Sequence, residues 1–225
     1  MCFYAWVRAI LYAGGRMTVE ESVFLTLDEA QEAVCIDFDQ YGPQPAQMHR
    51  VMDILGVDHP IPEGEPLGGL VRSLFTLYRP DAGQLLDICT EVFWARARQG
   101  RGPAGEIGLF IPTDMECFHC TRCGKCCRSL DFHRECLAED VALWREKGRD
   151  DILEWVGQNR DGDYLIWVRP GTDLVTEICP WLEESGGCWT CSIHDLKPEI
   201  CREYPGSGKH AYKTGCPTAN ARCHI

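Results

Sequence analysis

Apolar residues recur at helical intervals in much of the first half of the chain. The clearest pattern runs from Asp81 to Arg98 and stops before Gly100. Its apolar positions would lie on one side of a helix, and they are Leu85, Leu86, Ile88, Cys89, Val92 and Phe93. A helix is therefore predicted over this segment.

Boundary signals predict three more helices upstream. Thr26 and Glu29 have the spacing of a capping box, ahead of an alanine-rich segment that ends near Asp39. Two further helices are predicted at 47–55 and 67–78, which Gly56 and Pro80 would end.

The remaining apolar runs fit strands or short helices. Val23–Leu27 and the opening apolar segment fit strands, although periodicity alone also admits helices. Asp163–Arg169 is predicted to be a strand. Leu174–Ile178 would pair with it as a hairpin, because Pro170-Gly171 supplies a turn. Short helices are predicted at 137–147 and 151–156.

A change of composition near residue 112 predicts two parts. The stretch 99–105 holds three glycines and a proline in seven residues, which indicates a loop or linker, so the boundary is placed within 99–114. We expect an α+β fold. A mainly helical region, 1–112, would precede an irregular cysteine-rich metal-binding domain, 113–225, with short helices and a hairpin.

Charge and hydropathy argue against two classes of binding partner, nucleic acids and membranes. The net charge of −12 argues against nucleic acid and against anionic membrane surfaces. No stretch approaches the roughly 18 uninterrupted apolar residues of a membrane-spanning helix. We expect neither nucleic-acid binding nor membrane insertion.

Cysteine is the residue that stands out, with 15 copies, 12 of them between Cys117 and Cys223. Such density indicates a disulfide scaffold, a metal site or a scatter of buried thiols. A disulfide scaffold normally requires secretion, but the N-terminus has no basic n-region and Arg8 interrupts its apolar run. We therefore expect a cytoplasmic protein whose clustered, reduced cysteines bind metal.

The spacing of these cysteines favours an iron–sulfur cluster. Five of them form the pattern C-x2-C-x2-C-x2-C-C, namely Cys117, Cys120, Cys123, Cys126 and Cys127. Two-residue spacing lets successive thiolates turn toward one centre, as in ferredoxin-type loops. Those loops take their last ligand from a remote cysteine that proline commonly follows, and this chain has Cys179-Pro180 and Cys216-Pro217.

Zinc is the alternative metal. The turn from Cys120 to Gly124 has the form of a zinc knuckle, and Cys188-x2-Cys191 supplies a second pair. The adjacent Cys126 and Cys127 suit zinc less well, because neighbouring side chains are expected to diverge. We prefer a [4Fe–4S] cluster as cofactor and keep zinc as the alternative. Three interleaved cations would favour the thiolate form of either site: Arg122, Lys125 and Arg128.

The same residues resemble a known family. Phe118–Arg128 is similar to the signature F-x-C-x2-C-G-x-C-C-R of the YkgJ-type CxxCxxCC cysteine-cluster proteins, a family described as zinc- or iron-chelating. The later segments resemble its C-P-F-L, C-x-I-Y, R-P, C-R-x-Y-P and closing cysteine motifs in order, at Cys179–Leu182, Cys191–His194, Lys197-Pro198, Cys201–Pro205 and Cys216-Pro217. The resemblance covers about residues 117–217.

The resemblance implies a set of eight ligands, which are Cys120, Cys123, Cys126, Cys127, Cys179, Cys191, Cys201 and Cys216. Eight suits two four-cysteine sites, or one cluster with structural partners. Cys188 joins the candidate metal ligands because of its C-x2-C partner. Three positions depart from the family pattern of phenylalanine, tyrosine and arginine, namely Trp181, His194 and Lys197. Cys35 and Cys89 lie on apolar helical faces and are interpreted as core residues.

Three functions follow from these residues. The first is an iron–sulfur protein that carries electrons or serves as a redox accessory subunit, with a protein redox partner or a larger complex. The second is a structural or interaction module that zinc stabilises. The third is a cluster-dependent enzyme that modifies a protein or peptide, for which no catalytic residue stands out in the sequence.

Overall fold

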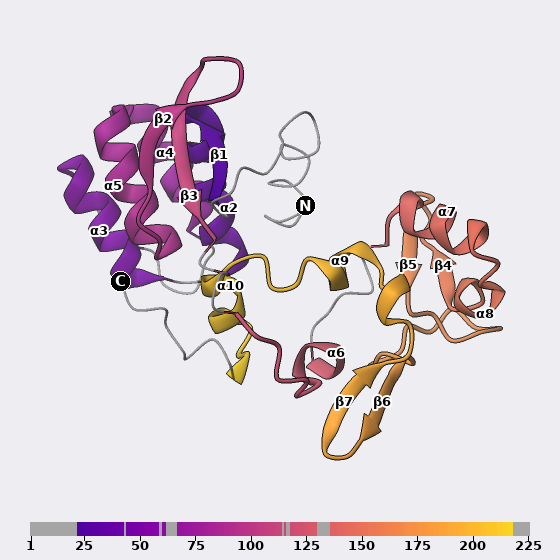
Figure 1. The fold of residues 1–225 in the computed structure, drawn as a ribbon. Helices are drawn as coiled ribbons and strands as arrows, with labels where there is room; N and C mark the ends of the chain where they lie inside the picture. Colours follow the sequence, from indigo (N-terminus) through magenta and orange to yellow (C-terminus); the bar gives the residue numbers. More distant parts are fainter. Residues whose placement is uncertain are drawn as a thin grey trace. The chain divides into compact units, whose positions relative to one another are not determined.

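The computed structural model describes residues 22–42, 44–58, 60–61, 67–113, 115, 118–129 and 136–217. The predicted opening strand, Cys117 and Cys223 lie outside these residues. The chain forms two compact units (Figure 1). Unit 1 comprises Met1–Cys117 and Ser207–Lys209, and unit 2 comprises Phe118–Gly206 and His210–Ile225.

Unit 1 contains an antiparallel three-stranded sheet in the order β1-β3-β2. The strands are β1 (Ser22–Thr26), β2 (Arg98–Arg101) and β3 (Ile107–Pro112). Val23–Leu27, which fitted a strand by pattern, forms most of β1, and its last residue begins the helix that follows. The loop or linker predicted at 99–105 proves to be a turn between two strands. Its first residues, including Gly100, pair with β3 as part of β2, and Gly102 and Gly105 lie in the turn that follows.

Four helices follow the predicted boundaries closely, and they are α2 (Leu27–Gln40), α3 (Pro45–Leu55), α4 (Gly68–Tyr78) and α5 (Ala82–Phe93). Thr26 caps α2 with the predicted capping box. The last helix ends five residues before the predicted Arg98, because Trp94 takes a left-handed conformation (φ 58°). α2 and α5 pack on the sheet, while α4 packs on α2 and α3 on α5 (Figure 1). Cys35 and Cys89 lie in this core, as predicted.

A buried ion pair completes unit 1. Lys209 Nζ lies 2.5 Å from Asp37 Oδ1 and 2.6 Å from the carbonyl oxygen of Val92. The rings of Tyr41 and Trp94 lie 5.4 Å from the same ammonium group. Both charged side chains are 2% exposed, so each needs the other's charge in this apolar setting. No sequence pattern predicted this pairing.

Unit 2 consists of short elements: α6 (Lys125–Ser129), α7 (Ala138–Glu146), α8 (Asp150–Leu153), β4 (Val156–Gln158), β5 (Tyr164–Ile166), β6 (Leu182–Ser185), β7 (Cys188–Cys191), the 3-10 helix η1 (His194–Leu196), α9 (Glu199–Arg202) and most of α10 (Gly208–Lys213). Trp144 and Trp167 fill the centre of a small core. Together with unit 1, these elements confirm the predicted α+β class.

The hairpins of unit 2 differ from those predicted. β5 pairs with β4. Leu174–Ile178 does lie antiparallel to the end of the predicted Asp163–Arg169 strand, through the bridge between Val168 and Val175 and two backbone hydrogen bonds of 2.8 Å, but this pairing is too short to form a named hairpin. β6 and β7 form a second hairpin around Gly186 and Gly187, whose φ angles are 61° and 80°. Two positive φ angles suit a tight hairpin turn, so this Gly-Gly pair was an available signal.

No helix in the described part of the chain combines the length and the apolar character that crossing a bilayer requires.

Candidate metal centre

The first cysteines of unit 2 form a tight turn. Arg122 takes a left-handed conformation (φ 55°), and its amide N–H donates to Cys120 Sγ at 3.4 Å. Gly124 (φ 67°) passes so close to β7 that an added Cβ would lie 2.6 Å from Trp189 Cγ. The Trp189 amide donates to the Arg122 carbonyl at 2.8 Å. The turn and β7 are therefore held together by backbone contacts.

Cys126 and Cys127 follow on α6, both half-buried. Their sulfur atoms are 3.9 Å apart, so the expectation that these side chains diverge is wrong. The interaction with Cys127, followed by burial, raises the pKa of the Cys126 thiol. The Cys127 carbonyl accepts from the Cys179 amide at 3.2 Å, which ties the remote Cys-Pro motif to α6.

Four thiols from separate segments of unit 2 lie close enough for their charges to interact, and they are Cys126, Cys179, Cys191 and Cys201. Burial raises the pKa of the Cys201 thiol, and the charges of the other three thiolates raise it further. Burial is also the main reason that the pKa of Cys179 rises to about 11, with added contributions from the charges of Cys191 and Cys126. The structure thus brings together cysteines from four family motifs that lie far apart in sequence.

A side chain of α7 anchors α9, the short helix that carries Cys201. The fully buried Asp140 side chain accepts from the Glu199 amide at 2.9 Å, at the first turn of α9. Arg202, from the same turn, lies 3.2 Å from the same carboxylate oxygen. Lys197, just before α9, lowers the pKa of Cys201 against the larger effect of burial. The positive charge of Lys197 is therefore close enough to act on the thiol group. The sequence-based predictions included Arg122, Lys125 and Arg128 as cations near the thiols, but not Lys197.

Amide groups are aimed at several of the sulfurs. The Trp181 amide lies against Cys179 and the Ile193 amide against Cys191, and each lowers the pKa of its thiol. The Arg122 amide donates to Cys120 in the same way. In each case the donor is the residue two positions after the cysteine. Such N–H donors stabilise thiolates around metals and clusters, so these residues fit a sulfur-bound metal centre.

A second set of cysteines surrounds Tyr204. Burial raises the pKa of its phenol to about 12, and the charges of Cys126, Cys216 and Cys123 raise it as well. The Tyr204 hydroxyl hydrogen-bonds Thr214 Oγ1 at 2.7 Å. Cys126 is therefore a neighbour of both sets.

Cys188 does not join its expected partner. It lies three residues from Cys191 on an extended strand, so their side chains leave β7 on opposite faces. Cys188 is exposed, whereas Cys191 is half-buried. Cys136 is buried in the core of unit 2.

Within the described ranges, no three His, Cys, Asp or Glu side chains are arranged to hold one metal ion. The nine predicted ligands therefore stay a prediction, although the structure makes several of them neighbours.

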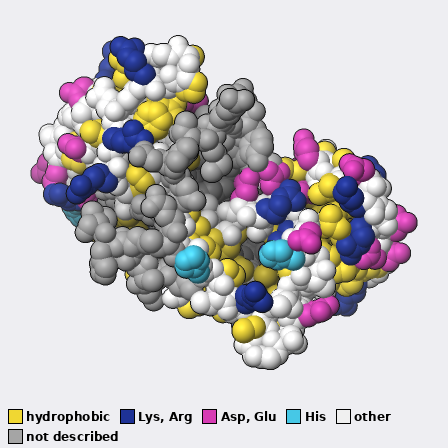
Figure 2. Space-filling model, viewed as in Figure 1, with side chains coloured by type: hydrophobic (Ala, Val, Ile, Leu, Met, Phe, Trp, Pro, Cys, Tyr) yellow, Lys and Arg dark blue, Asp and Glu magenta, His cyan; other side chains and the backbone are white. Residues whose placement is uncertain are grey.

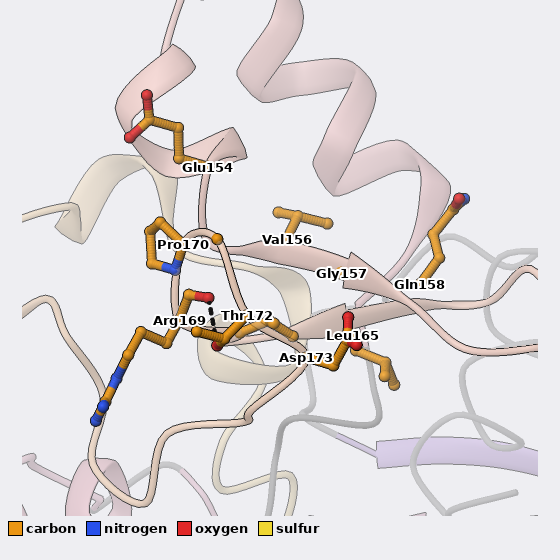
Figure 3. A pocket seen from close by; sticks show the side chains of 11 residues that line it. Glu154, Val156, Gly157, Gln158, Leu165, Arg169, Pro170, Thr172 and Asp173 are labelled. Carbon is orange, nitrogen blue, oxygen red and sulfur yellow. Dashed lines mark hydrogen bonds between the residues drawn. The ribbon is translucent and has the colours of Figure 1, made fainter.

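Unit 2 also has an open groove of about 460 Å³ beside β4 and β5 (Figure 3). Glu154, Arg169 and Asp173 contribute its charged groups. In Figure 3 the Glu154 and Arg169 side chains extend in different directions. The Thr172 hydroxyl donates a hydrogen bond to the Arg169 carbonyl oxygen at 2.8 Å. The polar groups do not converge on one point, and the groove residues include no cysteine.

The surface of unit 2 mixes both signs of charge. Around α7 and α8, Lys and Arg side chains alternate with Asp and Glu on the face seen in Figure 2. The exposed pair Arg149 and Asp151, 2.7 Å apart, is one example.

The sequence analysis missed the tryptophans beside the cysteines. Trp167 and Trp181 pack with Cys179 and Cys191 around the core of unit 2. Trp181 could have been found, since it lies within the Cys179–Leu182 motif where the family has phenylalanine. Trp167 lies in a predicted strand, and nothing in its neighbourhood pointed to the cysteines.

Comparison with known proteins identifies the cysteine-rich part. Residues 119–223 match the CxxCxxCC family, which is described as a "Putative zinc- or iron-chelating domain". No curated protein and no solved structure matches the chain. The match runs through every cysteine motif noted above, from the Cys120 turn to Cys216. The family model thus matches the cysteine-rich part of the chain, and the resemblance drawn from the cysteine motifs is confirmed for residues 119–223.

Proposed function

We propose that unit 2 binds an iron–sulfur cluster, preferably [4Fe–4S], and that the protein transfers electrons or serves as a redox accessory subunit. The supporting observation is that the charges of Cys126, Cys179 and Cys191 act on the half-buried Cys201 thiol, and that amide donors lie against Cys179 and Cys191. A donor set made only of thiolates selects soft metal centres, among them iron–sulfur clusters and zinc.

The number of sulfurs favours a cluster over one zinc ion. A structural zinc site takes four ligands, but the Tyr204 group adds Cys123 and Cys216 to the four thiols. Hydrogen bonds from amides to the sulfurs also tune cluster potentials. A redox role would use this tuning, whereas a structural zinc site has no potential to tune.

The size of the core supports a structural dependence on metal. Seven buried residues form the described core of unit 2, against twenty-three in unit 1. A core this small commonly needs a metal or disulfides to hold the fold. The described cysteines of unit 2 are free thiols, so a metal centre would supply this stabilisation.

A partner protein would complete the redox role. The net charge of −12 would steer the protein toward a partner that carries a basic face and away from acidic ones.

Zinc is the second candidate, and one distance favours it. Tetrahedral zinc–thiolate bonds of about 2.3 Å place two ligand sulfurs about 3.8 Å apart. The Cys126 and Cys127 sulfurs are 3.9 Å apart. The alternative function is an interaction module that zinc stabilises and that has no redox activity.

Metal analysis of anaerobically purified full-length protein tests the proposal. Iron with labile sulfide and visible absorption would support the cluster. Colourless protein with stoichiometric zinc would replace it with the zinc module, and metal-free protein would contradict both.

Two serine variants on β7 provide a matched comparison. Cys191→Ser should lose most of the metal, because Cys191 belongs to the group of four thiols. Cys188→Ser should keep it, because this side chain leaves the other face of the same strand. Equal retention by both variants would contradict the assignment of the thiol group.

A further inference from the structure

Three tryptophans form a row through the core of unit 2. The ring centroids of Trp144 and Trp167 are 5.7 Å apart, and those of Trp167 and Trp181 are 5.9 Å apart. Trp144 and Trp167 are almost fully buried. The row therefore runs from α7, through the residue that follows β5, to the Cys179–Leu182 motif.

The indole N–H groups of these tryptophans are not equally satisfied. Trp144 Nε1 donates to the Leu196 carbonyl at 2.8 Å. Trp167 Nε1 and Trp181 Nε1 are buried, and neither has a hydrogen-bond partner among the described residues. A buried donor without an acceptor costs about 1–3 kcal/mol, so two of them in one small core call for an explanation.

Both unsatisfied indoles lie beside the cysteines. Trp167 lies in the core of unit 2, and Cys179, Cys191 and Trp181 pack against that core. Trp181 is two residues from Cys179, and its own amide lies against the same sulfur. The satisfied Trp144 lies one ring further from Cys179 in the row. The missing acceptors are thus confined to the side of the core that adjoins the thiols.

We propose that the indole N–H groups of Trp167 and Trp181 donate to sulfur atoms of the metal centre and act as positioning residues for it. This inference rests on the proposed function, because thiolate or sulfide sulfurs bound to metal would supply the acceptors. A metal-bound sulfur carries more negative charge than a neutral thiol and is the better acceptor for a buried N–H group. Trp181 would add such a donor where the family pattern has phenylalanine.

The two donors should affect the metal–sulfur bonds. A hydrogen bond to a thiolate lowers the energy of the sulfur electrons, and hydrogen bonds around metal ligands also orient them. Loss of one donor should therefore weaken metal binding and shift sulfur-to-metal charge-transfer absorption to lower energy.

Tryptophan-to-phenylalanine variants of the full-length chain test this inference, with Co²⁺ added to the metal-free protein as the probe. Trp167→Phe and Trp181→Phe keep a ring and remove the N–H group. Each should bind Co²⁺ about tenfold more weakly and move the thiolate-to-cobalt band to lower energy. Trp144→Phe is the matched control, since its N–H bonds a backbone carbonyl. It should lower stability and leave the band unchanged.

The outcomes separate the two proposals. If the wild-type chain gives no thiolate-to-cobalt band, the proposed metal site itself fails. If the wild-type chain binds Co²⁺ and both variants match it in band position and affinity, only the role of the indoles is overturned. A water molecule as the hidden acceptor would give this second result. Should Trp167→Phe fail to fold, Trp181→Phe decides the matter, because phenylalanine is the family's residue there.

Discussion

At the scale of single residues, His210 should make the stability of unit 2 depend on pH. Burial lowers the pKa of its imidazole to about 4, whereas an unfolded chain protonates histidine near its usual value of 6.5. Between these values the unfolded state binds a proton that the folded state does not. Stability should therefore be complete above about pH 6.5 and should fall by up to about 3 kcal/mol toward pH 4.

A phenylalanine variant isolates this effect. His210→Phe keeps a ring against Tyr204, whose centroid lies 5.2 Å from that of the imidazole. Its unfolding free energy, measured with urea at pH 7 and pH 4.5, should change less than that of the wild type. If the unfolding free energy of His210→Phe changed as much between pH 7 and pH 4.5 as that of the wild type, His210 would not be the source of the pH dependence.

The residues that sequence reasoning could find were those with a strong pattern of their own. Cysteine motifs stand out by spacing, and the charges of Cys126, Cys179 and Cys191 do act on the Cys201 thiol. Trp167 had no such pattern, because its importance lies in an indole N–H whose acceptor is absent from the sequence around it. Side-chain hydrogen bonding between distant segments depends on tertiary structure, which local periodicity does not contain.

At the scale of secondary structure, prediction succeeded where the signal was local. The helices of unit 1 begin and end at caps and glycines that act within one turn, such as Thr26 and Gly56. The predicted pairing of Asp163–Arg169 with Leu174–Ile178 forms only in part, and the pairing of β5 with β4 was missed, because strand pairing depends on which segments meet and not on the segment alone. β6–β7 was missed although Gly186-Gly187 offered a turn signal.

The contact between the Cys120 turn and β7 gives a test at the same scale. Gly124→Ala should strain a left-handed residue and also push Trp189 away, because the new Cβ would lie 2.6 Å from Trp189 Cγ. Because β7 carries Cys191, the affinity of the protein for Co²⁺, measured by titration, should fall about tenfold.

Gly148→Ala is the matched control for this variant. Gly148 has a similar φ of 63°, but an added Cβ there would meet no atom within 4 Å. It should cost about 1 kcal/mol of stability through backbone strain alone, without changing the affinity for Co²⁺. Equal metal binding by the two variants would show that the close approach to Trp189 does not matter.

At the scale of the whole molecule, unit 1 depends on a residue from near the end of the chain. A fragment of residues 1–117 would lack Lys209 and would leave the buried Asp37 carboxylate without that cation. Asp37→Asn should therefore stabilise this fragment. In the full-length chain the same change should destabilise unit 1 by about 3 kcal/mol, because it leaves Lys209 buried without its carboxylate.

This reversal of sign can be measured by urea unfolding of the fragment and of the full-length chain, each with and without Asp37→Asn. The asparagine side chain would keep an oxygen for Gln44, which donates to Asp37 Oδ1 at 2.9 Å, so the comparison isolates the charge. The exposed pair Arg72 and Glu32 gives the control, since Glu32→Gln should cost well under about 1 kcal/mol in both backgrounds. If Asp37→Asn changed the unfolding free energy in the same direction in the fragment and in the full-length chain, the ion pair would not be what ties Lys209 to the rest of unit 1.

The ion pair also sets an order of events during synthesis. Asp37 and Lys209 are 172 residues apart in the chain. At translation rates of about 5–20 residues per second, the ribosome makes Lys209 roughly ten to thirty seconds after Asp37. Every family cysteine except Cys216 is translated in that interval. A nascent chain would thus expose these thiols to the cellular metal supply before Lys209 could pair with Asp37.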